Sequence, residues 1–155
     1  MMIGAQYDKE STLSLKLFVV LTRALEAIEK QVATNIKSYG LNLTEFAVLE
    51  LLYHKGDQPI QKIGQKILLA SSSITYVVDK LEEKKYLYRV ACPNDRRVTY
   101  ASISEEGRQL IDDIFPKHLE ALNEIMGGLS ASEKEIAIEH IKKLGLHAKS
   151  LDTKS

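Results

Sequence analysis

The fold of this chain is decided by residues 71–107, which read SSSITYVVDKLEEKKYLYRVACPNDRRVTYASISEEG. In the first half of the stretch, apolar residues recur at steps of three and four, as on one face of an amphipathic helix that ends near Lys85. The period then changes, because residues 87–91 and 98–103 are rich in Tyr, Val and Thr and predict two short strands. The turn-rich segment 92–97 between them indicates a hairpin with a basic tip.

Three helices are expected before this stretch. Residues 11–38 carry an apolar stripe at helical spacing and need a partner for a second face, either other helices of the chain or a second subunit. Thr44 is expected to cap a second helix that Gly56 closes, and Pro59 suits the first turn of a third helix. The expected buried side of the second helix is Val48, Leu49, Leu51 and Leu52, and the third helix carries the apolar residues Ile60, Ile63 and Ile67.

Two further helices are expected after the hairpin. Ser104 can cap a fifth helix, in which Pro116 should produce a kink, and the capping-box pattern that begins at Ser130 opens a sixth. The predicted order is therefore α-α-α-α-β-β-α-α. This order describes a mainly helical chain with a small β-hairpin wing.

Positive charge is concentrated in the middle of the chain. The sequence has 155 residues with 21 Lys/Arg and 21 Asp/Glu, so its net charge is zero. Residues 58–97 nevertheless hold 8 Lys/Arg against 4 Asp/Glu, net +4, whereas residues 1–57 are net −1 and residues 98–155 are net −3. A local positive patch suits the binding of phosphate groups. The alternative is chance clustering on a solvated surface.

The sequence also indicates where the protein works. It has no run of about 18 apolar residues, so no transmembrane helix and no membrane partner are expected. Residues 1–14 lack a basic region followed by an apolar stretch and are not expected to be a signal peptide. The single cysteine, Cys92, cannot form an intramolecular disulfide. We therefore expect a cytoplasmic protein.

A short helix, a turn, a second amphipathic helix and a hairpin form the winged helix-turn-helix plan. In that plan the second helix enters the major groove of DNA and presents hydrogen-bonding side chains to base edges. On a helical wheel, the outward face of this helix is rich in hydroxyl groups, and free backbone N–H groups at its start suit a phosphate. The expected DNA-binding residues here are Ser71, Ser72, Ser73, Thr75, Tyr76 and Lys80. An ordinary solvated helix face is the alternative.

The hairpin tip strengthens the DNA-binding interpretation. An arginine at the end of a two-stranded ribbon can enter the minor groove, where A·T tracts deepen the negative potential. The carboxylate of Asp95 can pair with Arg97 and fix its direction before DNA arrives. We therefore expect Asn94, Asp95, Arg96 and Arg97 to contact DNA, with a solvated surface turn as the alternative.

Residues 95–107 resemble the signature of the MarR family of transcriptional regulators, which runs Asp-x-Arg, a strand and then Leu-Thr-x-x-Gly. Here Ile103 and Ser104 stand in place of Leu-Thr, a departure that keeps an apolar residue and a hydroxyl cap. Upstream, residues 43–49 read LTEFAVL and resemble the family's second helix. The resemblance covers roughly residues 12–147, nearly the whole chain.

The resemblance implies a single MarR-type domain over residues 1–155. Residues 39–103 would be the winged helix-turn-helix, and residues 11–38 and 104–148 would be the dimerisation helices. It further implies a homodimer that binds a pseudo-palindromic operator in double-stranded DNA. Arg97 is then the minor-groove residue.

More narrowly, residues 43–100 resemble the MhqR group, bacillus-type repressors of quinone-detoxification genes. That similarity implies a repressor released by a small aromatic or quinone-like effector. The family usually leaves a crevice between the dimer helices and the winged domain, and apolar and aromatic residues should line it. The expected ligand-binding residues are Phe18, Thr22, Phe46, Tyr53 and Phe115, with plain core packing as the alternative.

Cys92 is the candidate redox residue, because Arg89, Arg96 and Arg97 lie close in sequence and positive charge favours a reactive thiolate. An inert half-buried thiol is the alternative. The four histidines are scattered without metal-ligand spacing, and no nucleophile motif or nucleotide-binding loop occurs. We therefore expect no metal, no cofactor and no enzymatic activity. The competing functions are a helical dimeric module that binds another regulator and a small enzyme that uses Cys92.

Overall fold

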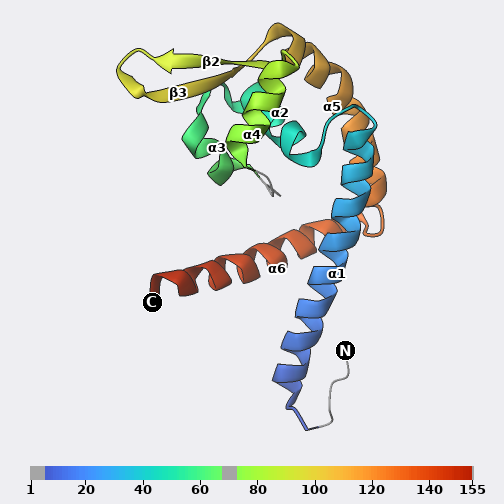
Figure 1. The fold of residues 1–155 in the computed structure, drawn as a ribbon. Helices are drawn as coiled ribbons and strands as arrows, with labels where there is room; N and C mark the ends of the chain where they lie inside the picture. Colours follow the sequence, from blue (N-terminus) through green and yellow to red (C-terminus); the bar gives the residue numbers. More distant parts are fainter. Residues whose placement is uncertain (1–5, 68–72, 155) are drawn as a thin grey trace. The chain divides into compact units, whose positions relative to one another are not determined.

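The computed structural model describes residues 6–67 and 73–154 and has a mainly helical fold with one small antiparallel sheet (Figure 1). The helices are α1 (Lys9–Lys37), α2 (Leu43–Lys55), α3 (Ile60–Lys66), α4 (Ile74–Glu83), α5 (Glu105–Ile125) and α6 (Ala131–Ser150), followed by the 3-10 helix η1 (Leu151–Lys154). The strands are β1 (Gln58–Pro59), β2 (Leu87–Cys92) and β3 (Asp95–Ile103). The predicted helical class and wing are confirmed, with one strand added.

The chain divides into two compact units, Met1–Leu122 and Asn123–Ser155. The first unit contains α1 to α4, the sheet and most of α5, and the second contains the end of α5, α6 and η1. Among the described helices, none is both long enough and apolar enough to span a bilayer.

The sheet has the strand order β1-β3-β2. Strands β2 and β3 pair from Leu87 opposite Ile103 to Ala91 opposite Thr99, and an irregularity then brings Cys92 opposite Asp95. The hairpin is therefore longer than expected, because of the segment 92–97 only residues 93–94 lie outside the strands. Strand β1 was not predicted, since two residues are too few to show an alternating pattern.

The core of the first unit lies between the end of α1, helices α2, α3 and α4, the sheet and the first half of α5. Its largest fully buried side chains are Ile36, Val48, Leu49, Leu52, Ile63, Val77, Val78, Leu81, Leu87, Ile111 and Ile114. The predicted buried face of α2 is thus confirmed, and of the four apolar residues expected on the buried face of α4, Val77, Val78 and Leu81 are buried and Ile74 is partly buried. On α3, Ile63 is fully buried, while Ile60 and Ile67 are only partly buried.

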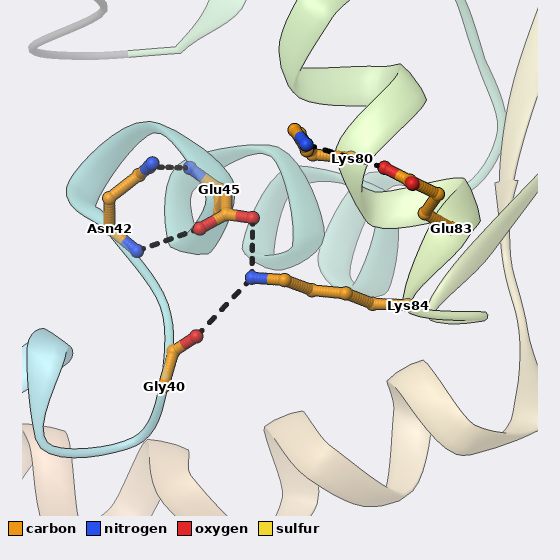
Figure 2. Close-up of polar contacts among 6 residues, drawn as sticks. All are labelled: Gly40, Asn42, Glu45, Lys80, Glu83 and Lys84. Atoms are coloured by element: carbon orange, nitrogen blue, oxygen red, sulfur yellow. Dashed lines mark hydrogen bonds and ion pairs between the residues drawn. The ribbon is translucent and has the colours of Figure 1, made fainter.

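The cap of α2 differs from the prediction. Asn42, and not Thr44, is the N-cap: its Oδ1 accepts the N–H of Glu45 at 2.8 Å, and Glu45 Oε1 accepts the N–H of Asn42 at 3.0 Å (Figure 2). Thr44 lies inside the helix and is buried. The reciprocal Asn-x-x-Glu pairing satisfies two free N–H groups, which Thr44 could not do alone.

The predicted caps of the last two helices are confirmed. Ser130 and Glu133 form the capping box of α6, with N–H to oxygen distances of 2.9 and 3.2 Å. Ser104 Oγ accepts the N–H of Gly107 at 3.0 Å at the start of α5. Pro116 lies within α5 as expected.

Helices α1 and α6 leave large apolar side chains exposed. Ile36 is the only buried residue of α1, and α6 has none. The exposed apolar side chains of these two helices include Leu13, Leu17, Phe18, Val20, Leu25, Ile136, Ile138, Ile141, Leu144 and Leu146. The partner that the sequence required for the long first helix is therefore not supplied within the first unit.

Candidate nucleic-acid interface

Helix α4 presents a polar face because its apolar face is buried. Val77 and Val78 belong to the core, while Thr75 is exposed and Tyr76 is 60% exposed. The ammonium of Lys80 lies 5.5 Å from the centre of the Tyr76 ring, a cation–π distance. The structure thus brings these three predicted residues to one accessible stretch of helix.

The start of α4 is only partly described. Ser73 is the exposed N-cap residue, and its side chain makes no capping hydrogen bond. The predicted residues Ser71 and Ser72 lie outside the described residues.

The end of α4 is fixed to α2 by a buried carboxylate. Lys84 Nζ lies 2.8 Å from Glu45 Oε2 and 3.4 Å from the carbonyl oxygen of Gly40 (Figure 2). Glu45 is only 5% exposed and also completes the α2 capping box. Sequence reasoning missed this pair, although the Asn-x-x-Glu pattern at residues 42–45 was a usable signal for the carboxylate.

The wing carries a pre-oriented arginine. Asp95 Oδ1 accepts the backbone N–H of Arg97 at 3.0 Å and its Nε–H at 3.1 Å, and Asp95 Oδ2 lies 3.3 Å from Nη2. These hydrogen bonds lower the pKa of the Asp95 carboxyl, so it stays ionised beside the guanidinium. The Arg97 side chain is nevertheless 90% exposed. The predicted pairing is confirmed, and the guanidinium remains available to a ligand.

The other predicted wing residues are also accessible. Asn94 lies at the tip between the two strands, and Arg96 follows Asp95 on β3; both are exposed. Together with Arg97 they place two guanidinium groups and an amide at the end of the hairpin, which in Figure 1 projects from the helices of the first unit.

Arg89 connects the wing to α4. From β2, its Nη1 lies 2.5 Å from Glu82 Oε1 and its Nη2 lies 2.5 Å from Asp79 Oδ1. The hydrogen bond with Asp79, assisted by the charges of both carboxylates, raises the pKa of Arg89. Sequence reasoning placed this arginine beside Cys92, but its guanidinium is directed to carboxylates. Cys92 itself is a free, half-buried thiol.

Three of the five predicted ligand-binding residues meet around two histidines. The His118 ring lies 4.8 Å from Phe46, and the His54 ring lies 4.9 Å from Tyr53 and 5.1 Å from Phe115, measured between ring centres. Sequence reasoning missed both histidines because they come from different helices and no local pattern connects them. We call these five residues the aromatic cluster.

His118 has an unusual environment within the aromatic cluster. Burial lowers the pKa of His118, and the negative charge of Glu50 opposes that effect in part. Its Nδ1 lies 3.3 Å from Asn35 Oδ1. Asn35 belongs to α1 and Phe46 to α2, so the histidine on α5 contacts residues of two other helices.

Among the described residues, no ring contact or hydrogen bond joins the other two predicted ligand-binding residues to the aromatic cluster. Phe18 is 66% exposed on α1, and the hydroxyl of Thr22 donates to the carbonyl oxygen of Phe18 on the same helix. A cavity of about 610 Å³ is present instead at the α1–α2 junction, and none of the five predicted residues lines it. Its lining residues are Ala33, Lys37, Gly40, Leu41, Asn42, Leu43, Thr44 and Glu45.

Within residues 6–67 and 73–154, no group of three or more His, Cys, Asp or Glu side chains is arranged to hold a metal ion. Every buried side-chain nitrogen or oxygen atom in that part of the chain has a hydrogen-bond partner.

This chain is similar in sequence to known transcriptional regulators. A sequence model described as the MarR family matches residues 41–99. The HTH-type transcriptional regulator MhqR of Bacillus subtilis (strain 168) is 57% identical over 141 residues, 91% of this chain and 97% of that protein.

Two solved structures share the fold. Sco3205, a MarR family transcriptional regulator from Streptomyces coelicolor solved in complex with DNA, has a TM-score of 0.75 at 17% identity, over 90% of this chain and 91% of that chain. Bordetella bronchiseptica BpsR, described with a mechanism for regulation of its DNA binding by 6-hydroxynicotinic acid, has a TM-score of 0.74 at 21% identity, over 84% of this chain and 98% of that chain.

Proposed function

Because this chain belongs to the MarR family and is a DNA-binding transcriptional regulator, we propose that it acts as a homodimeric repressor on a pseudo-palindromic operator. The observation that carries the proposal is the environment of the Arg97 side chain. A side chain that is 90% exposed, yet held by a carboxylate through three contacts, is suited to a ligand that replaces water around it. A minor groove of DNA is such a ligand, because its negative potential attracts the guanidinium. A repressor of this kind works in the cytoplasm, where the chromosome lies.

The division of contacts follows from the positions of the two elements. Thr75, Tyr76 and Lys80 on α4 would face base edges and phosphates in the major groove, and Ser71, Ser72 and Ser73 would contact phosphate at its start. Asn94, Arg96 and Arg97 would lie along the adjacent minor groove. In a homodimer, two such winged helix-turn-helix regions related by a two-fold axis would match a DNA site whose halves are about one helical turn apart, roughly 34 Å.

The experiment is a fluorescence anisotropy titration with the DNA upstream of the protein's own gene. Arg97→Ala should weaken binding by roughly 1–3 kcal/mol, the loss expected for one good contact. Lys117→Ala is the matched control and should bind like the parent. It removes a cation on α5 whose side chain is 60% exposed. If Arg97→Ala binds as tightly as the parent at the same salt concentration, the wing assignment is wrong.

For the effector, we propose a small aromatic or quinone-like compound that binds at the aromatic cluster. Phe46, Tyr53 and Phe115 supply ring surface, and two imidazoles supply polar atoms at its edge. Phe18 and Thr22 of α1 would complete the site only in the assembled dimer. In BpsR, which shares the fold, a hydroxylated aromatic acid regulates DNA binding. The ligand would cause release from DNA if it binds best to a conformation of the dimer in which the distance between the two winged helix-turn-helix regions does not fit the operator.

A rival trigger is modification of Cys92 by an electrophile, and one experiment separates the two. Release from DNA by 1,4-benzoquinone and by its hydroquinone is measured for the parent, Cys92→Ser and Phe115→Ala. Binding at the aromatic cluster predicts that the serine variant is released like the parent and that the alanine variant is not. If the parent is released and Cys92→Ser is not, the aromatic cluster is excluded as the quinone site.

A further inference from the structure

Helix α4 carries a charge that opposes the binding of DNA. Between Ile74 and Glu83 it has three carboxylates, on Asp79, Glu82 and Glu83, and one cation, Lys80, so the helix alone is net −2. Duplex DNA carries one negative charge per about 1.7 Å of its length. The excess positive charge of the central segment therefore does not come from the helix that would enter the groove.

The structure pairs each carboxylate of α4 with a cation. Glu83 lies 3.5 Å from Lys80 on the same helix. Asp79 and Glu82 share the two-pronged guanidinium of Arg89, which comes from β2 and not from α4. Arg89 is held in register opposite Ala101 by the β2–β3 ladder, so the sheet fixes the backbone from which the guanidinium extends.

The solvent exposure of the Arg89–Asp79–Glu82 ion pairs argues against a role in folding stability alone. The Asp79 side chain is 58% exposed and that of Glu82 is 43% exposed, and ion pairs in such surroundings contribute little to folding. The same exposure leaves both carboxylates accessible to the phosphates of a bound duplex. The effect of Arg89 should therefore be larger on DNA affinity than on stability.

We propose that Arg89 is a positioning residue for DNA binding that neutralises Asp79 and Glu82, so that α4 and the wing meet the duplex without an unpaired carboxylate. The proposal rests on the DNA-binding function and assigns no direct DNA contact to Arg89. It predicts that the carboxylates, and not the lost guanidinium alone, weaken binding when Arg89 is replaced.

The first measurement is operator affinity of Arg89→Gln across a range of salt concentrations. Binding should weaken roughly tenfold at low salt, equivalent to about 1.4 kcal/mol. The loss should shrink as salt rises, because screening reduces the repulsion between carboxylate and phosphate. Lys117→Gln removes one positive charge from α5 and should leave affinity within twofold of the parent.

The second measurement is a rescue. Asp79→Asn and Glu82→Gln are added to Arg89→Gln, and the triple variant should regain most of the parent's affinity, since no carboxylate remains to be neutralised. If the triple variant binds as weakly as Arg89→Gln, or more weakly, then Arg89 contacts DNA itself or the acids are needed, and the proposal is overturned. If the parent binds the operator and Arg89→Gln binds it equally well, the proposal for Arg89 is overturned. The proposed function is not affected by that result.

Arg89→Lys keeps the positive charge but loses the two-pronged geometry, and it decides the matter if Arg89→Gln does not fold. Neutralisation predicts that the lysine variant stays within about threefold of the parent. If Arg89→Gln folds, an Arg89→Lys variant that loses as much operator affinity at low salt as Arg89→Gln contradicts the proposal. If Arg89→Gln does not fold, a roughly tenfold loss of affinity in Arg89→Lys contradicts the proposal. Circular dichroism of each variant establishes that the comparison is between folded proteins.

Discussion

At the scale of single residues, the Asp95 carboxylate has two opposed effects on DNA binding. It adds a negative charge near the duplex, which disfavours binding, and it holds the Arg97 guanidinium in one direction, which favours it. An arginine that is free to rotate loses up to about 2 kcal/mol of side-chain entropy when it is fixed in a groove. We infer that orientation dominates, because three contacts from one carboxylate hold a side chain that is otherwise exposed.

We therefore predict that Asp95→Asn weakens operator binding severalfold, and less than Arg97→Ala does. The asparagine keeps one acceptor oxygen but loses the charge that strengthens the hydrogen bonds. Titrations at a single salt concentration measure the change, with Asp113→Asn on α5 as the control for removal of a carboxylate. Tighter binding by Asp95→Asn would mean that charge outweighs orientation.

The pKa of His118 leads to a prediction for stability. Burial lowers it below the ordinary value of 6.5, whereas the unfolded chain keeps the ordinary value. As the pH falls below about 6.5, the unfolded state takes up the proton first, so the free energy of unfolding should decrease until the pH passes the folded-state pKa. Well above pH 6.5 the histidine is neutral in both states and contributes no pH dependence.

Urea unfolding at pH 7.5 and pH 5.5 tests this. The parent should lose stability between the two values, and His118→Gln should lose less. His140→Gln on α6, an exposed histidine, should behave like the parent. Equal losses in the parent and in His118→Gln would show that another group controls the acid sensitivity.

Sequence reasoning succeeded at residue scale where partners are close along the chain. Asp95 and Arg97 are two residues apart, and the pairing was predicted. Arg89 was not assigned its partners, because they lie seven and ten residues away across a helix–strand junction. His118 and Phe46 come from different helices, so only tertiary packing brings them together.

At the scale of elements, the start of α5 depends on the absence of a side chain at Gly107. A Cβ built there would clash with the carbonyl oxygen of Tyr86 and would lie 2.8 Å from Ile103 Cγ1. The same carbonyl accepts the N–H of Ser104 at 3.0 Å, and Ser104 Oγ donates to the carbonyl oxygen of Lys85 at 2.6 Å. The first turn of α5 is thus packed directly against the backbone that follows α4.

Gly107→Ala should therefore lower the free energy of unfolding by about 1–3 kcal/mol, the usual cost of forcing extra volume into a packed site. Gly128→Ala is the control, because a Cβ at Gly128 meets no atom within 4 Å. Chemical denaturation compares the two. A Gly107→Ala protein as stable as the parent would show that the helix start can shift without loss.

Long elements were predicted more reliably than short ones. The apolar spacing of α2 and α4 repeats often enough to define a buried face, and the expected residues are buried on both, with Ile74 only partly buried. The two residues of β1 owe their strand structure to pairing with Ala101 and Tyr100, which no local pattern records. The cap at Asn42 was missed because Thr44 is also a capping residue type and lies only two positions later.

At the scale of the whole molecule, the apolar side chains of α1 and α6 require an explanation. A regulator that exposes Leu17, Phe18, Ile138 and Ile141 to water pays the cost of hydrating them. Burial of apolar surface contributes about 25 cal/mol per Å², so covering two helices in each of two copies is strongly favourable. A second copy of the chain is the partner that the family resemblance implies, and a two-fold dimer buries the same faces from both copies.

We predict that the parent sediments at micromolar concentration as a particle of about twice the chain mass of 17.4 kDa. Ile141→Glu with Leu144→Glu, which places two charges on the exposed apolar face of α6, should yield a monomer. Lys142→Glu also places a glutamate on α6 but removes no apolar side chain, and it should remain dimeric. The monomer should bind an operator with both half-sites no better than an operator with one, because a single winged helix-turn-helix region gains nothing from the second half-site. A parent that sediments at 17.4 kDa would remove the dimer, and with it the pseudo-palindromic operator, from the proposed function.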